Sequence, residues 1–296
     1  MIDNNMVEAL GLVLECGGFE KAAKALFISQ SAVSQRIKQL EECIGQVLIV
    51  RTSPPRPTPA GKQLLKYYKQ VKRLEEELSS RLVSTADEKY SVLTLGVNAD
   101  SLSTWFSGIV HDFFKNHHVL FHLIVDDQEE THKLLTNGDA VGCISASNVP
   151  VQGCSCQYLG SMQYKFAASP DFCKKWFPNG VSYESAIKAL AVMYNTKDTL
   201  HHKLFNNIFQ KLPEKFNTHY IPSPEQLLNG VISGLGYGVL PNIQARIYFE
   251  RRQLVDIFPG VYIDVNLYWH CWNIDLRFLR IFSKLLIESS RQALNP

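Results

Sequence analysis

Apolar residues recur with a helical period near the start of the chain. From Phe19 to Leu26 they fall at steps of three and four residues, which predicts a short helix with one apolar face. The pattern breaks at residues 28–29, and a second helix begins near Gln30. This helix turns three apolar residues inward, namely Val33, Ile37 and Leu40. A short alanine-rich helix, a tight turn and a second helix are together typical of a helix-turn-helix.

The outer stripe of the second helix carries hydroxyl, amide and ammonium groups and no carboxylate. Such a face can hydrogen-bond base edges in a DNA major groove without repelling phosphate. The alternative is an ordinary helical hairpin with a solvated polar face, which is the more common fate of so short a signature. Because the flanking segments described next favour DNA binding, we predict that this helix contacts DNA. The predicted contact residues are Gln30, Ser31, Ser34, Gln35, Arg36 and Lys38.

The segments on either side favour the DNA-binding interpretation. Upstream, a first helix with apolar residues at Val7, Leu10 and Leu14 could close a three-helix core. Downstream, a short strand ends in Arg51, and four prolines between residues 54 and 59 then exclude a helix. This stiff loop resembles a wing that holds out Arg51 and Arg56, and arginine there suits phosphate or a narrow minor groove.

The longest uninterrupted helical pattern runs from Pro59 to Leu82. It could pack on its own domain, but a small winged domain would not cover so long an apolar stripe, which favours an antiparallel dimer helix. Dimerisation also fits DNA with two half-sites on successive turns. The predicted dimer stripe consists of Leu64, Tyr68, Val71, Leu74 and Leu78.

These segments resemble a known family. The run AAKALFISQSAVSQRIKQLEE at residues 22–42, the strand ending in Arg51 and the turn Thr58-Pro59-Ala60-Gly61 are similar to the N-terminal domain of LysR-type transcriptional regulators. The segments VRTSPPRPT, VNADSLSTW and WFPNGV resemble the ArgP subgroup, whose members respond to arginine and lysine. The resemblance runs over nearly the whole chain, densely in the first 60 residues and patchily beyond Tyr183.

The resemblance implies a specific organisation and set of partners. It implies a winged helix-turn-helix, a linker helix that builds the dimer, and a two-lobed effector domain like a periplasmic binding protein. The implied partners are double-stranded operator DNA, a second copy of the chain in a homodimer or homotetramer, RNA polymerase, and L-lysine or L-arginine as effector. Asn195 departs from the subgroup, whose members tend to carry an acidic residue there.

Beyond a polar linker at residues 84–91, the pattern changes to alternating strands and helices, which predicts an α/β fold with parallel pairing. We place the DNA-binding domain at residues 1–58, the linker helix and hinge at 59–90, and the effector domain at 91–296. Lobe 1 is predicted to comprise residues 91–162 and 266–296, and lobe 2 residues 163–265. The crossings between lobes then lie near Met162 and Val265.

The effector site is predicted where the first effector-domain strand ends and a helix begins. Ligands bind at the carboxyl ends of strands in open α/β sheets, and a helix N-terminus attracts anions. Simple helix capping by Asp100 or Ser101 would explain part of this pattern. We predict that this segment binds a carboxylate and that acidic side chains hold a basic group, with Asn98, Asp100, Ser101, Ser103, Thr104, Asp127 and Glu225 as the effector-binding residues.

Charge is distributed unevenly along the chain. Residues 1–74 hold eleven Lys and Arg against six Asp and Glu, whereas the remainder has a net charge of −3. A basic module on an acidic remainder suits a polyanion at one end. The start of the chain lacks the pattern of a signal peptide, and no run of 18 apolar residues occurs, so we expect a cytoplasmic protein with no membrane partner.

The remaining chemistry-bearing residues form no enzyme motif. Seven cysteines are scattered and odd in number, which favours reduced thiols, although a redox-sensing role stays open. The pair Cys154 and Cys156 is a weak metal signal. We therefore expect no catalytic residue, no metal and no cofactor besides the effector. Two alternatives remain: an enzyme with an accessory basic domain, and a DNA-binding regulator with another effector or none, acting as an architectural or replication-origin binder.

Overall fold

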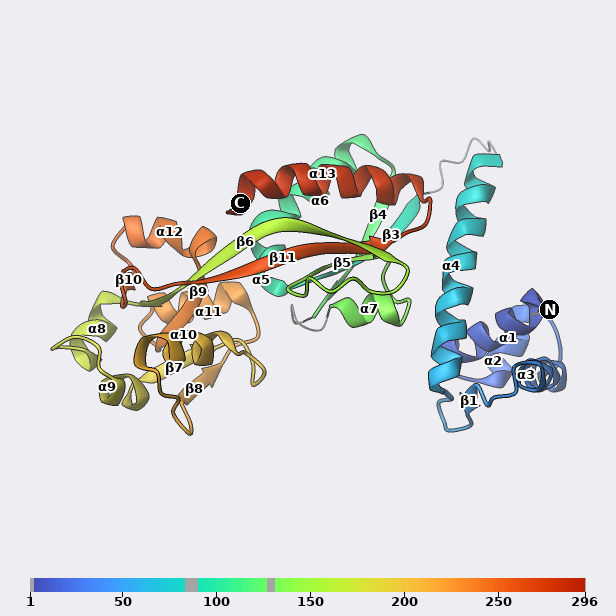
Figure 1. The fold of residues 1–296 in the computed structure, drawn as a ribbon, viewed down its shortest axis with the longest axis horizontal. Helices are drawn as coiled ribbons and strands as arrows, with labels where there is room; N and C mark the ends of the chain where they lie inside the picture. The colour runs from blue at the N-terminus through green and yellow to red at the C-terminus, as the bar shows by residue number, and fades with distance from the viewer. Residues whose placement is uncertain (1–2, 83–89, 127–130, 296) are drawn as a thin grey trace.

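The computed structural model describes residues 3–82, 90–126 and 131–295 (Figure 1). The chain begins with three helices, α1 (Asn4–Glu15), α2 (Phe19–Leu26) and α3 (Gln30–Ile44). A two-stranded antiparallel sheet follows, made of β1 (Ile49–Val50) and β2 (Arg56–Pro57). The helices enclose a separate apolar core that includes Leu10, Val33, Ile37 and Leu40. This arrangement is the winged helix-turn-helix that the residue pattern predicts.

Polar side chains fix the start of α3 and the two sides of the wing. The Ser29 hydroxyl accepts a hydrogen bond from the Ala32 N–H at 3.2 Å, so Ser29 caps α3. A carboxylate oxygen of Glu41 accepts the Leu48 N–H at 2.8 Å and positions β1. After the wing, the Thr58 hydroxyl donates to the Val47 carbonyl at 2.7 Å. Gly61 lies so close to the Leu48 carbonyl that any side chain there would clash, which explains the Thr-Pro-x-Gly turn.

The long helix α4 (Pro59–Leu82) has two different halves. Leu64 and Tyr68 pack on the core of their own domain, and the Tyr68 ring lies against Gly11. Leu74 and Leu78 are 41% and 56% exposed, and Leu82 is exposed further. Packing on its own domain therefore explains the first half of the predicted stripe, and the second half is uncovered in a single chain.

The first α/β unit follows as β3 (Ser91–Val97), β4 (Val119–Val125) and β5 (Gly142–Ser145), which pair in parallel. Between β3 and β4 the chain forms α5 (Ala99–Ser101), a π-helical segment (Leu102–Phe106) and α6 (Ser107–Asn116). Helix α7 (His132–Thr136) precedes β5. The carboxyl ends of β3 and β4 thus lie side by side, with Asn98 and Asp126 as the next residues.

The second α/β unit also contains three parallel strands. They are β7 (Leu190–Met193), β8 (Asn217–Tyr220) and β9 (Tyr237–Pro241), with β7 between the other two. The short antiparallel β10 (Val255–Asp256) pairs with β6 at the margin. The helices of this unit are α8 (Pro170–Trp176), α9 (Tyr183–Lys188), α10 (Leu200–Phe209), α11 (Pro224–Ile232) and α12 (Asn242–Glu250).

Two long antiparallel strands, β6 (Cys154–Ala168) and β11 (Ile263–Trp272), run through both units and join them into one sheet. The strand order is β4-β3-β5-β11-β6-β9-β7-β8. Met162 and Val265, where we predict the crossings between lobes, pair directly with each other. The last helix, α13 (Arg277–Ala293), returns to the first unit and packs on α6 and β3 (Figure 1).

Helix α4 contacts the first α/β unit through polar groups. The Lys69 ammonium lies 2.7 Å from a carboxylate oxygen of Asp139, and the Lys66 ammonium donates to the Gln152 carbonyl at 3.1 Å. Gly138 lies beside the same helix, close to Lys66. The DNA-binding domain is thus connected to the effector domain by charged contacts as well as by the chain itself.

Candidate functional site

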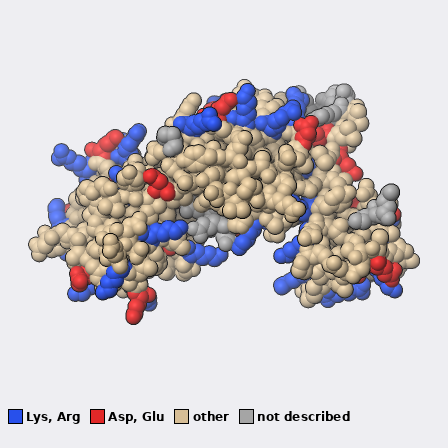
Figure 2. Space-filling view, viewed as in Figure 1, with Lys and Arg blue, Asp and Glu red and all other residues tan. Residues whose placement is uncertain are grey.

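The outer stripe of α3 is accessible. Gln30, Ser31, Gln35 and Lys38 are exposed, and Ser34 and Arg36 are half-buried. Figure 2 shows lysine and arginine side chains along the lower edge of this domain, where α3 and the wing lie in Figure 1. The structure therefore presents the predicted DNA-contacting residues on one basic, solvent-facing surface, which suits a polyanion.

The wing carries its two arginines at the surface. Arg51 and Arg56 are both exposed, and the Arg51 guanidinium lies 5.7 Å from the centre of the Phe19 ring. Stacking on that ring limits the positions that Arg51 can adopt. Lys38 lies 3.6 Å from Glu42 in a highly exposed ion pair that offers little resistance to exchange for phosphate. These side chains can therefore neutralise a DNA backbone.

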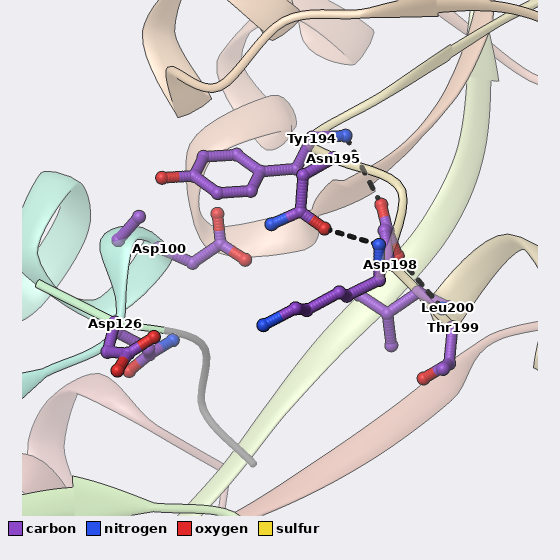
Figure 3. A pocket seen from close by; sticks show the side chains of 10 residues that line it. Asp100, Asp126, Tyr194, Asn195, Asp198, Thr199 and Leu200 are labelled. Carbon is purple, nitrogen blue, oxygen red and sulfur yellow. Dashed lines mark hydrogen bonds between the residues drawn. The ribbon is translucent and has the colours of Figure 1, made fainter. Parts of the chain in front are cut away.

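A pocket lies between the two α/β units, at the strand ends (Figure 3). Asp100 and Asp126 lie on one side of it, after β3 and β4, and Tyr194, Asn195 and Asp198 lie on the other, after β7. The full set of lining residues is Asn98, Ala99, Asp100, Asp126, Tyr194, Asn195, Lys197, Asp198, Thr199 and Leu200. With three aspartates and one lysine, the pocket has an acidic character.

Hydrogen bonds hold the acidic side chains in place. The hydroxyl of the buried Tyr164 donates to Asp100 at 2.7 Å. Asp198 accepts the N–H groups of Leu200 at 2.9 Å and Tyr194 at 3.4 Å, so this carboxylate also shapes the loop after β7. Asn195 accepts the Lys197 N–H at 2.7 Å. These hydrogen bonds fix the positions of Asp100, Asn195 and Asp198 in the pocket walls.

In residues 98–101, directly after β3, two polar side-chain atoms have no hydrogen-bond partner among the described residues. They are the side-chain oxygen of Asn98 and the hydroxyl of Ser101, both buried. A buried, unsatisfied polar atom costs free energy unless a bound group pairs with it. Asn98 lines the pocket and offers an acceptor, whereas Ser101 lies behind the lining residues.

The other sequence-predicted effector residues fall in less direct positions. The hydroxyls of Ser103 and Thr104 donate to the Asp100 carbonyl, at 3.1 and 2.6 Å, so their protons are used within the helix. Glu225 is exposed at the start of α11 and is not among the pocket-lining residues. Asp127 lies outside the described residues.

Sequence reasoning missed several residues that line the pocket. At the end of β4, sequence reasoning considers Asp126 and Asp127 together and selects Asp127, whereas Asp126 lines the pocket. Lys197, Asp198 and Thr199 come from the loop after β7, and it considers none of these three for the effector site. The rule that ligands bind at the carboxyl ends of parallel strands applies to β7 as well as to β3, and could have indicated that loop. Nothing in the sequence near Tyr164 indicates that its hydroxyl binds Asp100, because Tyr164 lies on β6, 64 residues further along the chain.

Burial disfavours the thiolate form of four cysteines, Cys143, Cys154, Cys156 and Cys173. Burial raises the pKa of Cys143 to about 12 and also raises the pKa values of Cys154 and Cys156. Cys156 lies 3.6 Å from His270. In the part of the chain that the structure describes, no three His, Cys, Asp or Glu side chains are placed to bind a metal ion. No helix among the described residues is long and apolar enough to cross a bilayer.

Comparison with known families matches both the domain that carries α3 and the wing and the domain that carries the pocket. The family model for bacterial regulatory helix-turn-helix proteins of the lysR family matches residues 5–62, and the model for the LysR substrate binding domain matches residues 86–272. The chain belongs to the LysR family of transcriptional regulators. This LysR-type protein is therefore a DNA-binding regulator with an effector-binding domain, and its family consists of transcription regulators and not of enzymes.

Relatives place this LysR-type chain within the ArgP group. It is 40% identical to the transcriptional regulator ArgP of Pseudomonas fluorescens strain Pf-5, over 100% of this chain and 99% of that protein. The crystal structure of ArgP from Mycobacterium tuberculosis superposes with a TM-score of 0.92, at 33% identity, covering 100% of this chain and 99% of that one. LysG of Corynebacterium glutamicum with bound effector Arg superposes with a TM-score of 0.86, at 29% identity, covering 99% and 100%.

Proposed function

We propose that this regulator binds operator DNA through α3 and the wing, under the control of a basic amino acid. The supporting observation for DNA is the exposed stripe of α3, which lacks carboxylates and adjoins the exposed Arg51 and Arg56. In this proposal, Gln30, Ser31, Ser34 and Gln35 contact base edges, and Arg36, Lys38 and the two wing arginines contact phosphate or the minor groove. Two copies of the chain bind two half-sites, and RNA polymerase is the proposed partner at the promoter.

Gln35 offers a direct test of base reading. Replacing it with alanine should weaken binding to the specific site by about 1–3 kcal/mol and should hardly affect binding to random DNA, because an amide pairs with base edges. Titrations of both duplexes at one fixed salt concentration measure the difference. Equal losses on the two duplexes would show that Gln35 does not read bases.

We further infer that the pocket between the α/β units holds the effector. The acidic lining is the observation that carries this inference, because Asp100, Asp126 and Asp198 provide partners for an ammonium or guanidinium group. The unsatisfied oxygen of Asn98 adds an acceptor suited to the same group. The bound arginine of the related LysG supports L-arginine or L-lysine as the ligand.

For the ligand carboxylate we propose the wall that faces Asp100 and Asp126, formed by the loop after β7. Lys197 is the cation among the lining residues, and Thr199 adds a hydroxyl. The sequence-predicted carboxylate site at residues 101–104 now depends on Ser101, because Ser103 and Thr104 donate within the helix. Lys197→Gln and Ser101→Ala separate the two arrangements: whichever variant loses affinity for the amino acid, and not for its decarboxylated amine, identifies the carboxylate partner.

Isothermal titration calorimetry of the full chain with L-lysine and L-arginine tests the effector site. Asp126→Asn should reduce affinity by about 10-fold, since it removes a charged hydrogen-bond partner of the bound cation. Glu225→Gln is the matched control, because this acidic residue is exposed and lies outside the pocket lining, and its affinity should stay unchanged. The effector assignment fails if the unaltered protein binds neither amino acid.

A further inference from the structure

Phe27 stands out in the turn between α2 and α3. Its side chain is 95% exposed, the largest exposed fraction among the large hydrophobic side chains that the structure describes. Its neighbours Leu26 and Ile28 both pack against the N-terminal core. The Phe27 ring therefore points away from the core and is almost entirely exposed.

The backbone at Phe27 is also unfavourable for this residue type. Phe27 has φ +54°, in the left-handed region, and ends α2 by donating its N–H to the carbonyls of Ala23 and Lys24. Glycine and asparagine suit such a helix end, whereas a bulky side chain is strained there. Exposure and strain both oppose phenylalanine in the free protein, so the residue is better explained by a partner outside the chain.

The position identifies the partner. Phe27 precedes Ser29, the N-cap of α3, by two residues, so their Cα atoms are at most about 7.6 Å apart. In a helix-turn-helix the start of the second helix enters the major groove. The apolar group that a base pair presents in this groove is the C5-methyl of thymine, which aromatic side chains contact. The α3 stripe itself offers hydroxyl, amide and ammonium groups, which read hydrogen-bonding edges.

We propose that Phe27 packs against a thymine methyl group in each half-site of the operator and adds a thymine preference that the α3 stripe does not supply. This rests on the proposed entry of α3 into the major groove. The contact removes an apolar ring from water. The free energy gained in this way offsets the cost of the left-handed backbone conformation at Phe27.

Thymine methyl removal tests the contact. Duplexes are first selected from a random pool by the full-length, unaltered protein, and their thymines are then replaced one at a time by deoxyuracil, which lacks the methyl. One position per half-site should lose about threefold to fivefold in affinity, the value of about one buried methyl. Phe27→Ala should show a similar loss on the thymine duplex and no further loss on the deoxyuracil duplex at that position.

A second variant separates DNA contact from local structure. Phe27→Asn replaces a strained residue by one that tolerates the left-handed conformation, so it should raise the melting temperature. It should also lower operator affinity, because the ring is lost. Gln210→Asn is the matched control, because Gln210 is exposed and ends α10 with φ +50°. It should also raise the melting temperature and should leave operator affinity unchanged.

Three results would overturn the proposal. The first is an identical deoxyuracil profile for the unaltered protein and Phe27→Ala, and the second is full operator affinity in Phe27→Asn. The third is conversion of either variant to monomer in light scattering, which would make Phe27 a contact between two copies of the chain. Gln35→Ala shows whether only the Phe27 contact fails or whether the proposed entry of α3 into the major groove fails as well. If it loses specificity while the Phe27 variants do not, the Phe27 contact alone is wrong; if neither loses specificity, α3 does not read the groove.

Discussion

At the scale of single residues, His201 links the effector pocket to stability. Its side chain is fully buried, its Nδ1 lies 3.8 Å from Asp198, and neither ring nitrogen has a hydrogen-bond partner among the described residues. The rings of Phe166 and Tyr237 lie within 6.2 Å of it. Burial lowers the pKa of His201 from 6.5 to about 4, against the opposing attraction of Asp198 and with a small contribution from His202. The imidazole is therefore neutral in the folded protein.

This lowered pKa predicts acid sensitivity. Between pH 6.5 and about 4 the unfolded chain binds a proton that the folded chain does not, so the free energy of unfolding falls as the pH decreases. The slope from this one group is at most about 1.4 kcal/mol per pH unit. His201→Asn should flatten the dependence, measured by urea denaturation at pH 7, 6 and 5. An unchanged slope would assign the acid sensitivity to other groups.

The pocket residues show where sequence reasoning ends at this scale. The strand-end rule correctly directs attention to the residues after β3 and β4, but Asp126 and Asp127 are adjacent, and a pattern of residue types does not say which side chain lines a pocket. The use of the Ser103 and Thr104 hydroxyls within their own helix was equally invisible, because it depends on rotamers and not on composition.

At the scale of elements, long periodic segments were predictable and short ones were not. The strands β3 and β4 belong to the alternating pattern predicted after residue 91, because each is a run of mostly apolar residues. Helices α8 and α9 have seven and six residues, and less than two turns is too short a segment for its period to be recognised in the sequence. The π-helical turn at residues 102–106 departs from the 3.6-residue period on which such predictions rest.

Helix α4 shows the same limit and yields a prediction. Periodicity placed Tyr68 and Leu78 on one stripe, but Tyr68 packs on α1 and Leu78 is exposed. We expect the uncovered part, from Val71 to Leu82, to contact a second copy. Leu78→Asp should convert the protein to monomer in light scattering, because a charge would be buried without a partner. Ser79→Asp, which places the charge on the adjacent exposed position, is the control and should remain dimeric.

The prediction for α4 has a definite contrary outcome. Leu78 is more than half exposed in one chain, so Leu78→Asp should fold, and its circular dichroism should match that of the unaltered protein. A folded Leu78→Asp protein that stays dimeric would place the interface on another surface.

At the scale of the whole molecule, the contact between Lys69 and Asp139 connects the DNA-binding and effector domains. If it relays effector binding, Lys69→Ala should reduce the effector-dependent change in operator affinity by about twofold to fivefold, the range expected for a partly exposed ion pair. The exchanged pair Lys69→Asp with Asp139→Lys should restore most of the change. Operator titrations with and without effector measure it, and a full response in Lys69→Ala would remove this contact from the relay.

The ionic contacts of this protein predict that its response depends on the ionic strength of the cell. Mobile ions weaken attraction between exposed charges, with a screening length of about 8 Å at physiological ionic strength, and act less on a partly buried pair such as Lys69 with Asp139. The same ions compete with lysine and arginine for DNA phosphates. A rise in internal potassium during osmotic stress would thus weaken DNA binding by the exposed wing arginines more than it weakens the contact of α4 with the effector domain. Dose–response curves recorded in one buffer would therefore describe one osmotic condition of the cell.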